Sequence, residues 1–340
     1  MSSRLAHHGV RIGFNPQIIT TTLKTNCPLQ KRQHVGQRRW YSSRDVDPRI
    51  KALGRTILDD YAAVREEYAT PTYPIVLAHG LLGFSEIKLA QALPSLQYWH
   101  GIQDALEQAG ATVITATVPP SSSIEQRAAS LRDQIAAARP SAVNIVAHSM
   151  GGLDARYLAS RLLGPDFSSP SPPFAIKSIT TIATPHRGSH FADFLMSDSA
   201  PIHLPRLYGL IERAGFGTQA FSQLTREYMT GTFNATVRDR DDVRYFSYGA
   251  MTDEPALLSP FRQPWRLIEQ AEGPNDGLVS VESSRWGAYK GTLVGVSHLD
   301  LINWSNRVRW TVREWMGVKR TFNAIAFYLD IADMLAKEGL

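Results

Sequence analysis

Residues 142–154, Ala-Val-Asn-Ile-Val-Ala-His-Ser-Met-Gly-Gly-Leu-Asp, decide the fold of this 340-residue chain. The apolar run at the start predicts a buried strand, and the glycines predict that a helix follows directly. Ser149 then lies on the tight turn between them, where its hydroxyl and the N–H of Met150 face the same space. This is the pattern of a nucleophile elbow, G-x-S-x-G, with Ala147 in place of the first glycine. The alternative is an ordinary serine that caps a helix.

Strand and helix patterns alternate on both sides of this turn. Continuous apolar runs are typical of strands that are buried on both faces of a parallel sheet. Strands are expected at 73–79, 112–118, 142–147, 175–183, 243–249 and 291–296, and helices at 47–68, 98–108, 124–139 and 152–163. Two further helices are expected to close the chain. The alternation predicts an α/β fold, with a mostly parallel central sheet and helices on both faces.

Residues 195–238 interrupt this alternation. Their apolar positions are separated by prolines and glycines and follow no single period. An irregular insertion late in an α/β sheet fits a helical lid better than a second core domain. The alternative is a few core helices of the main domain.

The first 41 residues differ in composition from the rest of the chain. They contain seven Lys or Arg and no Asp or Glu, which leaves 29 basic and 31 acidic residues in the remainder. An arginine-rich, acid-free segment with Ser and Thr is typical of a mitochondrial transit peptide, and a disordered basic tail is the alternative. We therefore expect a mitochondrial protein with one large domain over residues 42–340.

Composition also limits the partners. Outside the leader the chain is nearly neutral despite its formal charge of +5, so a nucleic-acid partner is not expected. The only cysteine, Cys27, lies in the leader, which excludes a disulfide framework or a thiolate metal site from the mature chain. No run of 18 apolar residues is present, so any contact with a membrane or a lipid droplet is expected to be peripheral.

A serine nucleophile needs a histidine base that a carboxylate orients. In α/β-hydrolases the three residues follow the order Ser, Asp or Glu, His, each on a loop after a strand. The histidines after Ser149 are His186, His190, His203 and His298. Only His298 follows a late expected strand, and Asp276 lies on a turn before that strand. We therefore expect Ser149, Asp276 and His298 to form a triad; an ordinary Asn-Asp-Gly turn and a structural histidine are the alternatives.

A second oxyanion donor is expected on the loop after the strand at 73–79. This loop reads His79-Gly80-Leu81, and the N–H of Leu81 would join that of Met150 around the developing alkoxide. His79 is expected to hold the loop, and not to transfer protons.

Longer motifs carry a family resemblance over residues 74–310. They are His-Gly-Leu at 79–81, Ala-His-Ser-Met-Gly-Gly-Leu-Asp-Ala-Arg-Tyr at 147–157, Thr-Pro-His-Arg-Gly-Ser at 184–189, Asn-Asp-Gly-Leu-Val at 275–279 and His-Leu-Asp at 298–300. In these motifs the chain resembles the bacterial true-lipase family of triacylglycerol hydrolases. When the amino-terminal leader is included, it is similar to the fungal mitochondrial members of that family. The resemblance implies an α/β-hydrolase with the same triad and oxyanion amides, an acyl glycerolipid substrate and a mobile lid.

Two points stay open at this stage. Bacterial members of that family hold the histidine loop with calcium, and Asp300 matches one carboxylate ligand, with Asp253 or Glu254 as uncertain second ligands. The chemistry itself requires no cofactor, so calcium remains an alternative. A phospholipase or short-chain carboxylesterase would use the same residues, and so would acyl transfer to an alcohol. A non-catalytic lipid-binding protein on a hydrolase scaffold is the alternative of a different class.

Overall fold

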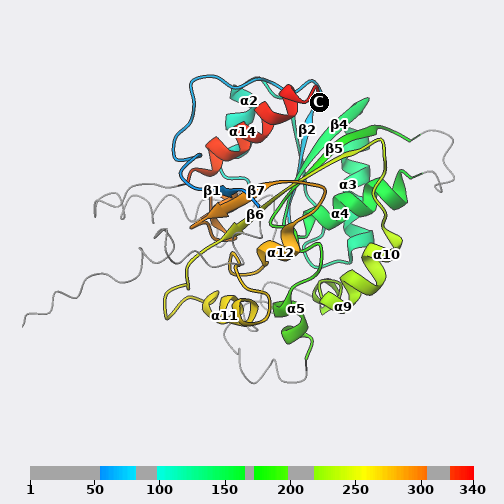
Figure 1. Cartoon of the computed structure of the whole chain (residues 1–340). Helices are drawn as coiled ribbons and strands as arrows, with labels where there is room; N and C mark the ends of the chain where they lie inside the picture. The colour runs from blue at the N-terminus through cyan, green and yellow to red at the C-terminus, as the bar shows by residue number, and fades with distance from the viewer. Residues whose placement is uncertain (1–53, 82–97, 165–171, 198–217, 305–321) are drawn as a thin grey trace, which may run out of the picture. The chain divides into compact units, whose positions relative to one another are not determined.

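The computed structural model describes residues 54–81, 98–164, 172–197, 218–304 and 322–340 (Figure 1). Within them the chain forms one sheet of seven parallel strands in the order β1-β7-β6-β5-β4-β2-β3. The strands are β1 (Thr56–Ile57), β2 (Ile75–Ala78), β3 (Val113–Ala116), β4 (Ala142–His148), β5 (Ala175–Ile182), β6 (Arg244–Met251) and β7 (Ala288–Val294). The expected parallel α/β sheet is confirmed.

The strand that leads to Ser149 lies inside the sheet. All seven residues of β4 are buried, between β2 on one side and β5 on the other. In the register, Ala147 is paired with Ala78 of β2 and with Thr181 of β5. Because the strands are parallel, their carboxyl ends meet at one edge, and the loops that follow β2, β4 and β5 come together there.

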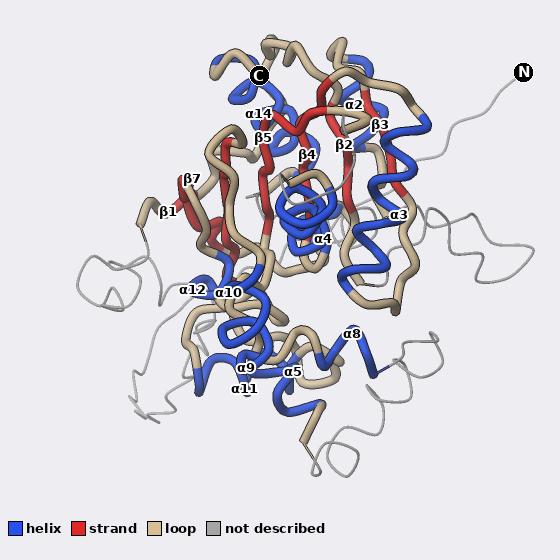
Figure 2. Tube along the Cα trace, turned by 90° about the vertical axis from the view of Figure 1, so that its right-hand side faces the viewer, coloured by secondary structure: helices blue, strands red, loops and turns tan. Residues whose placement is uncertain are grey.

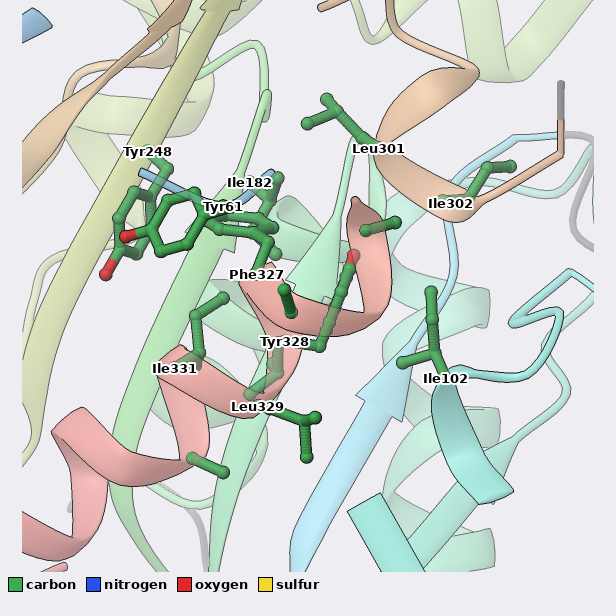
Figure 3. Close-up of a cluster of buried hydrophobic side chains, with 14 of the residues drawn as sticks. Tyr61, Ile102, Ile182, Tyr248, Leu301, Ile302, Phe327, Tyr328, Leu329 and Ile331 are labelled. Carbon is green, nitrogen blue, oxygen red and sulfur yellow. The ribbon is translucent and has the colours of Figure 1, made fainter. Parts of the chain in front are cut away.

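Helices cover both faces of the sheet (Figures 1 and 2). Side chains alternate along β2, so that Ile75 and Leu77 join one core cluster and Val76 and Ala78 the other. On the first face lie α2 (Ile102–Gln108) and α14 (Ala324–Lys337), and Figure 3 shows the Tyr61, Phe327 and Tyr328 rings in this cluster. On the second face lie α3 (Ile124–Ala137), α4 (Gly151–Tyr157) and the π-helix η1 (Leu158–Leu162).

Short helices surround the carboxyl edge of the sheet. They are α5 (His190–Leu195), α8 (Thr218–Ser222), α9 (Arg226–Tyr228), the π-helix η2 (Met229–Phe233), α10 (Asn234–Thr236), α11 (Arg262–Ala271), α12 (Val281–Ser284) and the 3-10 helix η3 (Asp300–Ile302). Met229 and Phe233 of the expected lid pack against Met150 and Leu153 in a buried cluster. This part of the insertion is therefore packed against the helix that follows Ser149. Residues 198–217 lie outside the described part of the chain, and the lid stays a prediction.

The helix expected over residues 47–68 is wrong for its described part. From residue 54 on, the chain forms β1 and a series of turns. Ile57 is paired with Leu293 and buried, whereas Val64, on the same expected helical face, is 49% exposed. The free edge of β7 offers backbone hydrogen bonds and burial, and these outweigh a weak helical pattern. One closing helix is α14; residues 305–321 lie outside the described segments. No helix in the described segments is long and apolar enough to cross a membrane.

Candidate active site

Ser149 occupies the strained turn that its sequence predicts. Its φ is 56°, a left-handed conformation that a residue with a β-carbon adopts only when its surroundings impose it. The N–H of Ser149 donates to the Ile182 carbonyl at 2.9 Å, and its own carbonyl accepts from Thr184 Oγ1 at 2.7 Å. Both partners belong to the β5 end, so the neighbouring strand holds the turn in place.

Small residues around Ser149 allow this close packing. A β-carbon on Gly80 would lie 2.6 Å from the β-carbon of Ser149, and one on Gly151 would collide with the Ala78 carbonyl. Both glycines are therefore required by the approach of the β2 loop to the turn. Ala147, at the first position of the motif, is fully buried in the second core cluster, where its methyl group is accommodated.

Asp276 and His298 meet as expected. His298 Nδ1–H donates to Asp276 Oδ2 at 2.7 Å, and the backbone N–H of His298 donates to the Asp276 carbonyl at 2.9 Å. The other carboxylate oxygen, Oδ1, accepts from the amides of Leu278 and Val279 at 3.0 and 2.9 Å. Because Nδ1 carries the proton that is donated to Asp276, the lone pair of His298 lies on Nε2, the atom that a general base uses.

Ser149 and His298 line the same apolar cavity. Its remaining wall is formed by Leu81, Tyr98, His148, Pro185, Ser189, Phe191, Ala192, Phe221, Leu224, Phe261, Leu278, Val279, Leu299, Ile302 and Trp304. Most of these side chains are apolar, so the cavity offers an acyl chain a dry surface beside the serine hydroxyl. The other expected candidates lie apart: His186 is buried elsewhere, His190 begins α5, and His203 is outside the described residues.

Leu81, which carries one expected oxyanion amide, lines the same cavity as Ser149, and Met150, which carries the other, directly follows the serine. Neither the N–H of Leu81 nor that of Met150 donates a hydrogen bond within the described part of the chain. His79 holds the Leu81 loop: its Nδ1–H donates to the Gly80 carbonyl at 2.9 Å, and its Nε2 accepts from the Val118 N–H at 3.1 Å. Burial lowers the pKa of His79 to about 4. Both ring nitrogens are engaged, which fits the structural role expected for this histidine.

Known proteins share these features. Residues 73–209 match the family described as the alpha/beta hydrolase fold. The chain is 34% identical to triacylglycerol lipase 2 of Saccharomyces cerevisiae, over 83% of this chain and 97% of that protein. The chain belongs to the lipase family of α/β-hydrolases. It is also 29% identical to a triacylglycerol lipase of Burkholderia plantarii, over 76% of this chain and 87% of that one. The Staphylococcus hyicus lipase shares the fold, with a TM-score of 0.57 at 20% identity over 81% of this chain and 98% of that one.

A buried ion pair in this lipase joins the oxyanion loop to the nucleophile helix. Arg127 of α3 donates from Nε to Asp154 Oδ2 at 2.9 Å, and from Nη2 to the His79 carbonyl at 2.8 Å. Neither side chain of the pair is more than 1% exposed. Burial raises the pKa of Asp154 to about 6, against the opposing charge of Arg127. The sequence motif contains Asp154, but nothing in the ordinary helical pattern around Arg127 indicated its role.

Tyr98 forms a second link that the sequence did not reveal. The Gly80 N–H donates to the Tyr98 hydroxyl at 3.1 Å, and this hydroxyl donates to His148 Nδ1 at 2.6 Å. The His148 ring lies 4.5 Å from the His298 ring, measured between centroids. Burial, together with the neighbouring His298, lowers the pKa of His148 well below its usual range. One hydroxyl therefore supports both the oxyanion loop and the ring beside the expected base.

Replacing Tyr98 with phenylalanine is expected to lower kcat by about 10-fold, since each 1.4 kcal/mol of lost support is a factor of about ten. The substitution keeps the aromatic packing and removes only the hydroxyl. Steady-state kinetics on a soluble ester should show the loss in kcat with KM nearly unchanged. Tyr68→Phe is the control, because that hydroxyl accepts from the Arg65 N–H, away from the cavity. Unchanged kcat in Tyr98→Phe would remove this residue from the support of the site.

Asp300 and Glu254, two of the three carboxylates that could bind calcium, are engaged within the protein. Asp300 Oδ2 accepts from the N–H and the hydroxyl of Ser297 at 3.1 and 2.6 Å. Glu254 forms ion pairs with Arg262, at 2.8 Å, and with Arg266. Among the described residues, no three His, Cys, Asp or Glu side chains are placed to hold a metal ion. A hard cation takes about six to eight oxygen ligands, and Asp300 and Glu254, held as they are, do not by themselves supply them. Asp253, the other candidate ligand, lines a cavity together with Asp276, Ser297 and His298.

Chelation tests the calcium site that the family resemblance implies. We expect EDTA at a large excess to leave the thermal unfolding midpoint and the hydrolysis of a soluble ester unchanged, because Ser297 already binds Asp300 and two arginines already compensate Glu254. Added calcium should likewise raise neither quantity. A drop of several degrees in the midpoint with EDTA, reversed by calcium, would show that a metal holds the histidine loop.

Proposed function

We propose that this lipase hydrolyses acyl glycerolipids, triacylglycerol and diacylglycerol, through an acyl-enzyme on Ser149. The observation that carries the proposal is that Ser149 and His298 line one apolar cavity and that Asp276 binds His298 at Nδ1. The names of the relatives from Saccharomyces cerevisiae and Burkholderia plantarii support a triacylglycerol substrate.

Each group in the site has a defined role in this mechanism. His298 Nε2 takes the proton of Ser149 as the hydroxyl attacks the ester carbonyl, and Asp276 stabilises the imidazolium that forms. The amides of Leu81 and Met150 donate to the negatively charged oxygen of the tetrahedral intermediate. His298 then returns its proton to the leaving glycerol oxygen. A water molecule, activated by the same histidine, repeats the attack and releases the fatty acid.

A comparison of hydrolysis rates on three substrates tests the proposal. The full chain should hydrolyse emulsified trioleoylglycerol, with lower rates on phosphatidylcholine and on a soluble butyrate ester, because the cavity wall suits a long acyl chain. Preference for phosphatidylcholine would favour a phospholipase, and preference for the butyrate ester would favour a short-chain carboxylesterase. If no ester is cleaved and a fluorophosphonate does not label the chain, the non-catalytic lipid-binding alternative gains instead.

We also propose that residues 1–41 direct this lipase to mitochondria. The support is the acid-free, arginine-rich composition of the segment. A fluorescent reporter fused to residues 1–50 should accumulate in mitochondria, whereas the same fusion with its arginines replaced by glutamine should not. A diffuse signal from the unaltered fusion would contradict the proposal.

A further inference from the structure

Two adjacent leucines are the most exposed large apolar side chains of the described residues. Leu257 is 78% exposed and Leu258 is 86% exposed, on the loop that joins β6 to α11. A single exposed leucine is common on protein surfaces. Two neighbouring leucines with almost no cover place two large apolar side chains in water on one short loop, and exposed apolar surface next to a functional pocket marks an interaction site.

This loop forms part of the active-site wall. Ala256 and Ser259, on either side of the leucines, line a cavity together with Asp276 and His298. Phe261, three residues after Leu258, lines both that cavity and the one that contains Ser149. Leu257 and Leu258 therefore extend outward from the rim of the site.

The loop is fastened at both ends. Trp265 Nε1 donates to the Thr252 carbonyl at 3.0 Å, and the Ser259 N–H donates to the Ala256 carbonyl at 2.8 Å across the leucines. Glu254 is paired with Arg262 and Arg266 of α11. With Asp253, the two acidic residues before the leucines equal in number the two arginines after them, so the local charge is balanced. A fixed turn that presents two apolar side chains loses little conformational entropy when they become buried.

The neighbouring helix α5 extends the apolar character of this end. Phe191 and Leu195 of α5 pack against Ile268 of α11, and the two helices lie side by side in Figure 1. Met196, directly after α5, is 42% exposed. Met196, Leu257 and Leu258 thus lie on the loops that adjoin two packed helices. The cavity wall includes Phe191 of α5 and Phe261 of the loop before α11.

We propose that Leu257 and Leu258 insert into an uncharged glyceride surface and hold the mouth of the cavity against it. The inference rests on the proposed function, because it assumes that the substrate arrives from a lipid phase. Three side chains cover far less than the roughly 1,600 Å² of a stable protein interface, which favours a lipid surface over a second copy of the chain. The compensated charges favour neutral lipid over an anionic membrane.

Binding is tested without turnover, in the Ser149→Ala background of the full chain. The probe is an emulsion of trioleoylglycerol, from which bound protein is separated by flotation. Leu257→Ser with Leu258→Ser should weaken binding by at least about 10-fold, since both side chains lose the gain from leaving water. Val64→Ser is the matched control, because Val64 is 49% exposed on the segment that packs against α14. Binding should be insensitive to salt up to about 0.5 M.

Kinetics of the active chain separate this inference from the proposed function. The double variant should lose about 10-fold on emulsified trioleoylglycerol and keep its rate on a soluble butyrate ester within about twofold. If the unaltered chain hydrolyses neither the emulsified glyceride nor the soluble ester, the proposed function is refuted and the binding result still stands. Three results would each overturn the proposed insertion of Leu257 and Leu258. They are equal binding of the emulsion by the double variant and its parent, binding of the parent only to anionic vesicles, and a dimer of the parent that the two substitutions dissociate.

Discussion

Ser149→Ala is expected to lower kcat by about a millionfold, the largest effect of any substitution in this lipase. Without the hydroxyl, no acyl-enzyme forms, and only the oxyanion amides and substrate binding remain to accelerate attack by water. KM should change little, because the serine contributes almost nothing to the apolar wall of the cavity. The side chain is small and alanine tolerates the φ of 56° as serine does, so the fold should persist.

The measurement combines turnover with covalent labelling. The parent chain should react with a fluorophosphonate at a single site, and Ser149→Ala should neither react nor hydrolyse a soluble ester. Ser178→Ala is the matched control, since Ser178 is a fully buried serine on β5 that donates to Asn144 and lies outside the cavity. That variant should lose some stability and retain labelling. Undiminished hydrolysis by Ser149→Ala would refute the mechanism.

The elbow could be predicted from sequence because local and distant constraints agree there. Residues 142–148 are apolar enough to be a central strand, and the small residues beside Ser149 are required by the approach of the β2 loop. The order of Ser149, Asp276 and His298 then placed all three at the carboxyl edge of one sheet. Their side chains come from loops, yet parallel strands fix where those loops meet.

The errors and omissions share a different cause. The expected helix at 47–68 failed because the free edge of β7, about 230 residues away in sequence, determines the conformation of Ile57. Tyr98 and Arg127 were missed because their importance lies in partners that the sequence does not place nearby: the Gly80 amide, His148 and the His79 carbonyl. A polar side chain in an ordinary helix or turn carries no local signal of such a role.

Mild acid is expected to unfold this lipase, and buried histidines are the reason. Burial lowers the pKa of His79 to about 4, and those of His148 and His186 fall well below their usual range. Cationic neighbours add to the effect: Arg127 near His79, and Arg156 with Arg187 near His186. In the unfolded chain all three rings take up a proton below a pH of about 6.5, whereas in the folded chain they stay neutral.

The sign and size follow from proton linkage. Below a pH of about 6.5 the unfolded state binds more protons, so each of the three histidines costs about 1.4 kcal/mol of stability per pH unit. Asp154 acts in the opposite direction, because its pKa of about 6 in the folded chain lets the native state take up a proton first. Between pH 6 and 4 the balance is a loss of roughly 3 kcal/mol per pH unit. The loss of about 6 kcal/mol across this range exceeds the whole stability of a domain at the lower end of the usual range of about 5–15 kcal/mol, and removes about 40% of it at the upper end.

Urea unfolding at pH 7.5, 6.0 and 5.0 measures this slope, and His186→Gln assigns part of it. The His186 ring binds Thr181 Oγ1 through Nε2 at 3.0 Å and accepts from Arg156 at Nδ1, so glutamine will cost stability at every pH. The informative quantity is the slope, which should decrease by about 1.4 kcal/mol per pH unit because one titrating group is gone. His100→Gln, at an exposed histidine, should leave the slope unchanged. Equal unfolding midpoints at pH 7.5 and 5.0 in the unaltered chain would show that these rings do not remain neutral in the folded protein.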